Sequence, residues 1–226
     1  MSRSKMVVAL VLLPLIAWPE VRAEQPVEIA DIFAREMIDA DLAYFERLTG
    51  PAWKTQAATK IYKVAGCEVT ATISKGSVRS LRLDLSERCT VDLAEFFMDW
   101  TGEIPPAHEL TFGDFDEAVG ATGRYYADCL IDCGNAFDPA VYEHWKGPRS
   151  DGFLEVLLET VPSSTHGLDA SRAWTAEMMQ HETEDWIFNR RFNCTNEYDG
   201  PARLAFRDVR IIAITIGRDI AVPPCE

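Results

Sequence analysis

Basic residues are scarce in this 226-residue chain, and long charge runs and low-complexity tracts are absent. The chain has 22 lysine and arginine residues against 36 aspartate and glutamate residues, and its net charge is −14. Such a negative field repels phosphate backbones and anionic membrane surfaces, so we expect no nucleic-acid partner. The same field attracts a partner with a basic surface. The alternative is that the net charge only keeps the protein soluble.

Apolar runs long enough to cross a bilayer, about 20 residues, are also lacking. The N-terminal apolar run, residues 6–17, follows two basic residues and is interrupted by Pro14. A basic start, a short apolar run and a small residue at Ala23 are typical of a signal peptide. We therefore expect removal of residues 1–23, no membrane span after cleavage, and export to a bacterial periplasm in preference to the extracellular space.

An unpaired cysteine is not expected, because the chain has six cysteines and all lie after the predicted cleavage site. In an oxidising compartment an even number indicates disulfides. The cysteines follow one another in three sequential pairs, so spacing favours Cys67–Cys89, Cys129–Cys133 and Cys194–Cys225. A zinc site at Cys129 and Cys133 would need a second close pair, and a redox site would need two intervening residues, so neither is favoured.

Hydrophobic periodicity predicts two long helices. Residues 28–48 carry apolar side chains at three- and four-residue steps and stop before Gly50. Residues 169–188 carry Trp174, Met178 and His181 along one stripe, with Asp169 as the capping residue.

Alternating apolar and polar residues predict a hairpin around the turn at Lys75-Gly76. If these two residues form the loop, Ile73 lies opposite Val78, and a one-residue bulge after Val78 sets Ala71 opposite Leu81. Further strands are expected at residues 153–161 and 209–216. The second is apolar at nearly every position, which is typical of a strand covered on both faces.

These elements predict an α+β fold with a mainly antiparallel sheet or sheets built from hairpins, two long helices packed on them, and stabilising disulfides. Consecutive prolines favour a boundary that separates an N-terminal lobe, residues 24–104, from a C-terminal lobe, residues 105–226. One continuous domain, residues 24–226, is the alternative. Residues 115–120 loosely repeat the pattern of residues 45–50, which fits either a duplicated helix–hairpin unit or an ordinary helix end.

Residues 129–139 form the most unusual stretch in the chain, since they combine two cysteines with Gly-Asn and Asp-Pro turns. A disulfide would turn it into a rigid, presented loop, and rigid loops suit binding because little order is lost on contact. A closed corner of the fold is the alternative. The candidate binding residues are Asp128, Asp132, Asn135, Phe137 and Asp138.

An acidic cluster with one imidazole offers a metal hypothesis. On a helix, His181, Glu184 and Asp185 would project from one side and face a divalent cation. The zincin pattern requires a second histidine where Asp185 stands, so a solvated helical face explains the residues better.

Carboxylates near Asp116 offer a pair for glycoside hydrolysis. The chain lacks a Gly-x-Ser-x-Gly elbow and any local triad pattern.

No catalytic signature and no cofactor motif rises above background. We therefore favour an exported, acidic, disulfide-bonded binding or inhibitor-like accessory protein that contacts another exported or envelope protein with a basic surface. The alternative is an exported hydrolase or metal-assisted enzyme that uses a carboxylate pair or His181. An exposed apolar rim around Tyr125, Tyr126 and Phe137 would favour the binding protein, and convergence of His181 and acids in a cleft would favour the enzyme.

Overall fold

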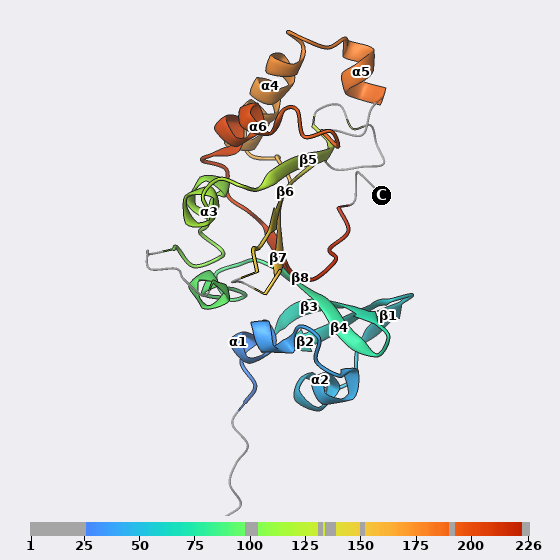
Figure 1. The fold of residues 1–226 in the computed structure, drawn as a ribbon. Helices are drawn as coiled ribbons and strands as arrows, with labels where there is room; N and C mark the ends of the chain where they lie inside the picture. The colour runs from blue at the N-terminus through green and yellow to red at the C-terminus, as the bar shows by residue number, and fades with distance from the viewer. Residues whose placement is uncertain are drawn as a thin grey trace, which may run out of the picture.

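The computed structural model describes residues 26–97, 104–130, 133, 139–149, 152–189 and 193–222. The predicted signal peptide lies outside these residues. The chain has an α+β fold in which eight strands form one antiparallel sheet, with the strand order β1-β2-β3-β4-β8-β7-β6-β5 (Figure 1).

The strands are β1 (Lys54–Gln56), β2 (Thr59–Val64), β3 (Cys67–Ser74), β4 (Ser77–Asp84), β5 (Arg124–Cys129), β6 (Ala140–Lys146), β7 (Glu155–Thr160) and β8 (Ala213–Gly217). The helices are α1 (Ile29–Ile32), α2 (Leu42–Thr49), α3 (Phe112–Val119), α4 (Thr165–Met178), α5 (Glu184–Asn189) and α6 (Asp199–Phe206), with two short 3₁₀ helices, η1 (Arg35–Met37) and η2 (Leu93–Phe96).

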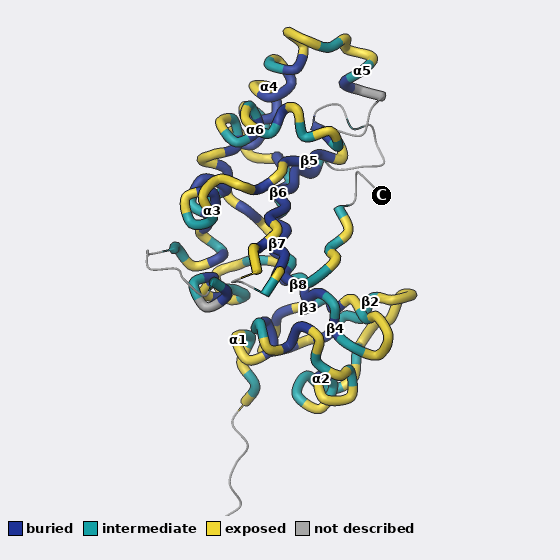
Figure 2. The backbone as a smooth tube through the Cα atoms, viewed as in Figure 1, coloured by how far each residue is buried: buried dark blue, intermediate teal, exposed yellow. Residues whose placement is uncertain are grey.

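Strand β8 joins two meanders into one sheet. It pairs with β4 on one side and with β7 on the other, so Ile214 lies between Leu83 and Leu158, and all three side chains are buried. This central position explains its apolar sequence, because both faces and both edges of the strand are covered (Figure 2). The sheet thus continues across the predicted boundary at residues 104 and 105. Division into two lobes stays a prediction.

The β3–β4 hairpin has the register deduced from its alternation. Ile73 lies opposite Val78 and Ala71 opposite Leu81, and the pairing shifts by one residue between Thr72 and Ile73. The extra residue on β4 is Arg79, which pairs with no β3 residue. The bulge keeps the apolar residues of β4 on the buried face after the turn.

The first long helix predicted from periodicity is wrong, because the structure divides that segment into α1, η1 and α2. Asp39 has a φ of 69°, which a helix cannot contain, and Asp41 then caps α2 through the backbone N–H groups of Ala43 and Tyr44. The backbone around Asp39 hydrogen-bonds to Val78 of β4 instead. Pairing with the sheet therefore outweighs the helical periodicity.

The second predicted helix is also shorter than expected. Ser164, and not Asp169, caps α4, and α4 ends at Met178. A turn separates it from α5, so residues 169–188 are not one helix. Trp174 and Met178 are fully buried, as their stripe predicted. The ring of Trp174 packs edge-on against Phe206 of α6 at 5.9 Å.

Helices cover one face of the sheet and its β5 end. Figure 1 shows α1 and α3 on one side of the strands, α4 and α6 beyond β5, and the C-terminal segment on the opposite side. The opposite side, which we call the open face, carries a small apolar cluster: Tyr126, Ala140, Tyr142, Leu157, Ile220 and Val222. The structure does not confirm a duplicated helix–hairpin unit, since a four-stranded meander follows α2 and a three-stranded one follows α3.

Disulfides join Cys67 to Cys89 and Cys129 to Cys133, the pairs that spacing favoured. Cys194 is disulfide-bonded as well, and Cys225, its expected partner, lies outside the described residues. The first bond links the start of β3 to the segment after β4. Disulfides of this kind fit an exported protein.

Candidate functional site

The predicted binding loop falls largely outside the described residues, which exclude Asp132, Asn135, Phe137 and Asp138. Asp128 is exposed near the end of β5, beside the Cys129–Cys133 disulfide. Tyr125 and Tyr126 do not form an exposed apolar rim, because they are only 0% and 7% exposed. They lie on opposite faces of β5, one in the helix-covered core and the other in the open-face cluster.

The metal hypothesis assumed one helix, and this assumption is wrong. His181 lies in the turn after α4, whereas Glu184 and Asp185 begin α5. All three side chains are exposed, and the imidazole ring of His181 lies 6.5 Å from the ring of Tyr198. Among the described residues, no group of three or more histidines, cysteines and acids is arranged to hold a metal ion.

The acids of α3 have three separate roles. Asp114 completes a capping box with Thr111 at the start of the helix. Glu117 forms an exposed ion pair with Arg207, in which Oε1 accepts a hydrogen bond from Nη2 at 2.7 Å. Asp116 is 4% exposed and turns into the core. Only Asp116 therefore belongs to a buried polar site.

That buried site joins α3, β5, β6 and α6. The Tyr125 hydroxyl donates to Oδ2 of Asp116 at 2.8 Å and lies 3.3 Å from Oε2 of Glu143. Nε of Arg203 donates to Oδ1 of Asp116 at 3.1 Å. Burial, followed by the negative charge of Asp116, raises the pKa of Glu143 well above its ordinary value. The folded protein therefore favours the neutral, protonated form of Glu143.

The carboxyl pair is sealed from solvent. Glu143 is 0% exposed, and its Oε1 atom has no hydrogen-bond partner among the described residues. Gly123 lies against this atom, since a Cβ there would overlap it. Glycosidases hold their two carboxyl groups about 5 Å or more apart around a substrate, whereas Asp116 and Glu143 are both hydrogen-bonded to the Tyr125 hydroxyl inside the core. The pair therefore ties four elements together and does not support the hydrolase alternative.

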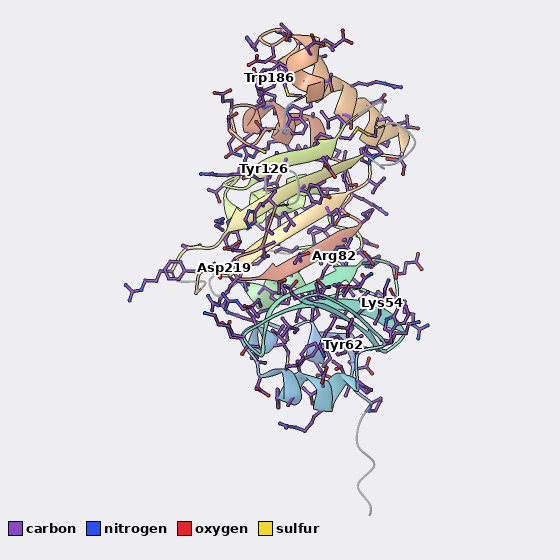
Figure 3. All side chains as sticks on the ribbon, turned by 90° about the vertical axis from the view of Figure 1, so that its right-hand side faces the viewer. Lys54, Tyr62, Arg82, Tyr126, Trp186 and Asp219 are labelled. Carbon is purple, nitrogen blue, oxygen red and sulfur yellow. A yellow bond between two sulfur atoms is a disulfide. The ribbon has the colours of Figure 1, made fainter. Side chains whose placement is uncertain are left out.

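A cleft of about 680 Å³ opens on the other face of β5 and β6. Alternation places Arg124 and Tyr126 of β5 on the open face, next to His144 and Lys146 of β6. Figure 3 views the sheet from this side and labels Tyr126. The lining residues are Thr122, Arg124, Tyr126, His144, Lys146, Cys194, Asn196, Ile220 and Val222.

Two cationic side chains and a buried imidazole define the chemistry of this cleft. His144 is 3% exposed, and its Nε2 atom lies 2.8 Å from Oε2 of Glu155. A carboxylate accepts, so Nε2 carries the proton and Nδ1 is the acceptor of the neutral ring. The pKa of His144 is lowered, chiefly by burial of the ring. The hydrogen bond and charge of Glu155 act against this shift, and the positive charges of Lys146 and Arg124 add to it. His144 is therefore a neutral imidazole beside two cations.

The loop of residues 193–199 forms one wall and closes the β5 edge of the sheet. Nδ2 of Asn193 donates to the carbonyl of Tyr125, and Oδ1 of Asp199 accepts the N–H of Tyr125. Side chains thus take the place of a neighbouring strand. Asn196, from the same loop, accepts a hydrogen bond from Nη1 of Arg124 at 3.0 Å.

The segment after β8 forms the other wall. Glu155 accepts the backbone N–H groups of Asp219 and Ile220 at 3.2 and 3.1 Å. Asp219 also pairs with Arg79, the bulge residue of β4. These contacts position Ile220 and Val222 beside the floor of the cleft.

Sequence reasoning did not find the cleft. Its only local signal is the alternation Arg124-x-Tyr126 and His144-x-Lys146, which places each pair on one face of a strand. The partner strand, the two walls and Glu155 come from other parts of the chain.

Searches of protein-family models, curated proteins and solved structures return no match to this chain. The helices in the described part of the chain are all too short or too polar to cross a membrane.

Proposed function

We propose that this chain is an exported binding or inhibitor-like accessory protein, that its compartment is a bacterial periplasm, and that it contacts another exported or envelope protein through the cleft on the open face of its sheet. The negative charge of the whole chain steers a partner with a basic surface at long range. The cleft then provides a local contact of the opposite sign.

One observation carries this proposal. In a chain of net charge −14, the described lining of the cleft contains Arg124 and Lys146 and no aspartate or glutamate. Folding has thus gathered positive charge in one concave place on an acidic protein. Concave sites with a few converging polar groups are where ligands and partner side chains bind.

The geometry of the cleft is set before a partner arrives. Asn196 positions the guanidinium of Arg124, and Glu155 positions the ring of His144. Cys194 in the wall is disulfide-bonded. Preorganised side chains lose little conformational entropy on contact, which favours binding.

The experiment is a pull-down from the exported protein fraction of the source cell, with the oxidised mature chain as bait. Lys146→Glu reverses one charge in the cleft, and its side chain is 69% exposed, so the fold is not at risk. Lys54→Glu is the matched control, because Lys54 is an exposed lysine on the opposite edge strand, β1 (Figure 3).

We expect one protein to be retained at low salt by the wild-type chain and by Lys54→Glu, and to be depleted on Lys146→Glu. High salt should weaken retention, because exposed charges are screened. Retention of no exported protein at either salt, or equal retention by all three baits, contradicts the proposal.

A further inference from the structure

We infer that the cleft binds a single carboxylate group attached to an apolar residue, as at the C-terminal end of a peptide segment of the partner. This inference rests on the proposed function and names the ligand of the same site.

The charge around the cleft matches one negative charge. Arg124 and Lys146 contribute two positive charges, and Glu155 lies behind His144 with its Oε1 atom 3.9 Å from Nζ of Lys146. The local sum is therefore one positive charge while His144 is neutral. A carboxylate neutralises this charge, whereas a doubly charged phosphate leaves an excess of negative charge inside a protein that is already acidic.

The donors are also arranged for a carboxylate. Nη1 of Arg124 is engaged by Asn196, and no other described residue accepts from the rest of its guanidinium. The planar fork of an arginine matches the two oxygens of a carboxylate. His144 lies directly opposite Arg124 on β6, with its Nδ1 atom not hydrogen-bonded to a described residue.

The remaining lining suits an apolar stem. Ile220 and Val222 are partly buried on the open-face cluster and line the cleft together with Tyr126. A volume of about 680 Å³ lies within the range of roughly 300–1,000 Å³ that small ligands occupy. The cleft therefore holds one or two residues at a chain end, with the charged group on Arg124 and the side chain on the apolar wall.

The experiment titrates the oxidised mature chain with the peptide acetyl-Ala-Ala-Leu that ends in a free carboxylate, and with the same peptide ending in an amide. Binding is measured by calorimetry and by competition with inorganic phosphate. We expect the amide to bind at least about tenfold more weakly, because a hydrogen bond to a charged group is stronger than one to a neutral group. Inorganic phosphate should not displace the peptide at equal concentration.

Two cleft variants and one control test the assignment. Arg124→Gln should weaken carboxylate binding about tenfold or more, and Lys146→Gln, at an exposed side chain, should weaken it severalfold without a risk to folding. Arg47→Gln on α2 removes an exposed arginine outside the cleft and should leave the affinity unchanged.

The inference is overturned if the amide binds as tightly as the carboxylate, if phosphate displaces the peptide, or if both cleft variants bind like the wild type.

The carboxylate inference and the proposed binding function can be refuted independently of each other. If an exported protein is retained in the pull-down but the peptide neither binds nor competes, the carboxylate inference is wrong and the binding function stands. If the peptide binds and no protein is retained, the carboxylate site stands and the protein partner is wrong.

Discussion

Arg124 and His144 are direct cross-strand neighbours on β5 and β6, and both line the cleft of the open face. The adjacent cross-strand pair, Tyr125 and Glu143, points the other way into the sealed carboxyl site. One strand pair therefore carries two polar sites of different kinds, one open to solvent and one closed.

Carboxylate binding in the cleft should strengthen as the pH falls from about 7.5 to 5.5. The pKa of His144 is lowered in the free protein by burial, while Glu155 raises it and Lys146 and Arg124 lower it. A bound carboxylate stabilises the imidazolium, so the complex takes up a proton and affinity rises with acidity. Dissociation constants at several pH values check this. In His144→Asn the same pH series should be nearly flat, and a wild-type slope retained by this variant contradicts the role of His144.

Glu143→Gln should change how stability depends on pH. The pKa of Glu143 is raised above its unfolded value of 4.5, so its contribution is fully present below that value and is lost as the pH rises toward the folded-state pKa. Glutamine has nearly the same shape as glutamate and is neutral at every pH. We expect the variant to lose less free energy of unfolding than the wild type between pH 5 and pH 8, measured by urea unfolding.

The matched control for this series is Glu117→Gln, at an exposed carboxylate of the same helix as Asp116. It should follow the wild-type pH dependence. Identical curves for Glu143→Gln and the wild type would show that Glu143 is not the titrating group.

Gly123→Ala should destabilise the protein by about 1–3 kcal/mol, the usual cost of overpacking a core. The new Cβ would overlap Oε1 of Glu143 and lie 2.7 Å from its Cγ, and Glu143 is too buried and hydrogen-bonded to move aside. Gly200→Ala on α6 is the control, since a Cβ there meets nothing within 4 Å. It should be neutral or stabilising by about 0.4–1 kcal/mol. Thermal unfolding of both variants measures the difference, and equal shifts would argue against the close contact.

Asn193→Gly should lower the free energy of unfolding by about 1–3 kcal/mol, because the buried side-chain amide of Asn193 hydrogen-bonds to Tyr125, Asp199 and Tyr198. Asn196→Gly is matched to it, as both asparagines have a left-handed φ, 57° and 63°, that glycine adopts freely. The second change removes only the contact with Arg124 and a weak loop bond, so it should be nearly neutral. Faster hydrogen exchange at the Tyr125 amide in Asn193→Gly alone would confirm that this loop closes the sheet edge, and equal rates would refute it.

Removal of the two described disulfides should have unequal effects. The bond between Cys67 and Cys89 spans 22 residues, and the bond between Cys129 and Cys133 spans 4. Loop-closure entropy then predicts a loss of about 3 kcal/mol for paired Cys→Ser changes at the first and about 2 kcal/mol at the second. Denaturant unfolding ranks the two variants. A larger loss at Cys129 and Cys133 would mean that native contacts around that turn outweigh the entropy of the unfolded chain.

Local sequence determined the features that depend on neighbouring residues. The alternation around Lys75-Gly76 was enough for the register and the bulge of the β3–β4 hairpin, because a period of two leaves one pairing that buries the apolar face. The pairing of Cys67 with Cys89 and of Cys129 with Cys133 followed from spacing. The apolar run of β8 indicated a strand covered on both faces, since only a central strand hides so many consecutive apolar residues.

Tertiary structure decided the rest. Periodicity predicted one helix over residues 28–48, but hydrogen bonds between the backbone near Asp39 and β4 broke it, and no local pattern reports a long-range pairing. The cleft lay beyond sequence reasoning for the same reason. Arg124, His144 and Asn196 are far apart in the chain, and only the antiparallel pairing of β5 with β6 and the loop over the β5 edge bring their side chains together.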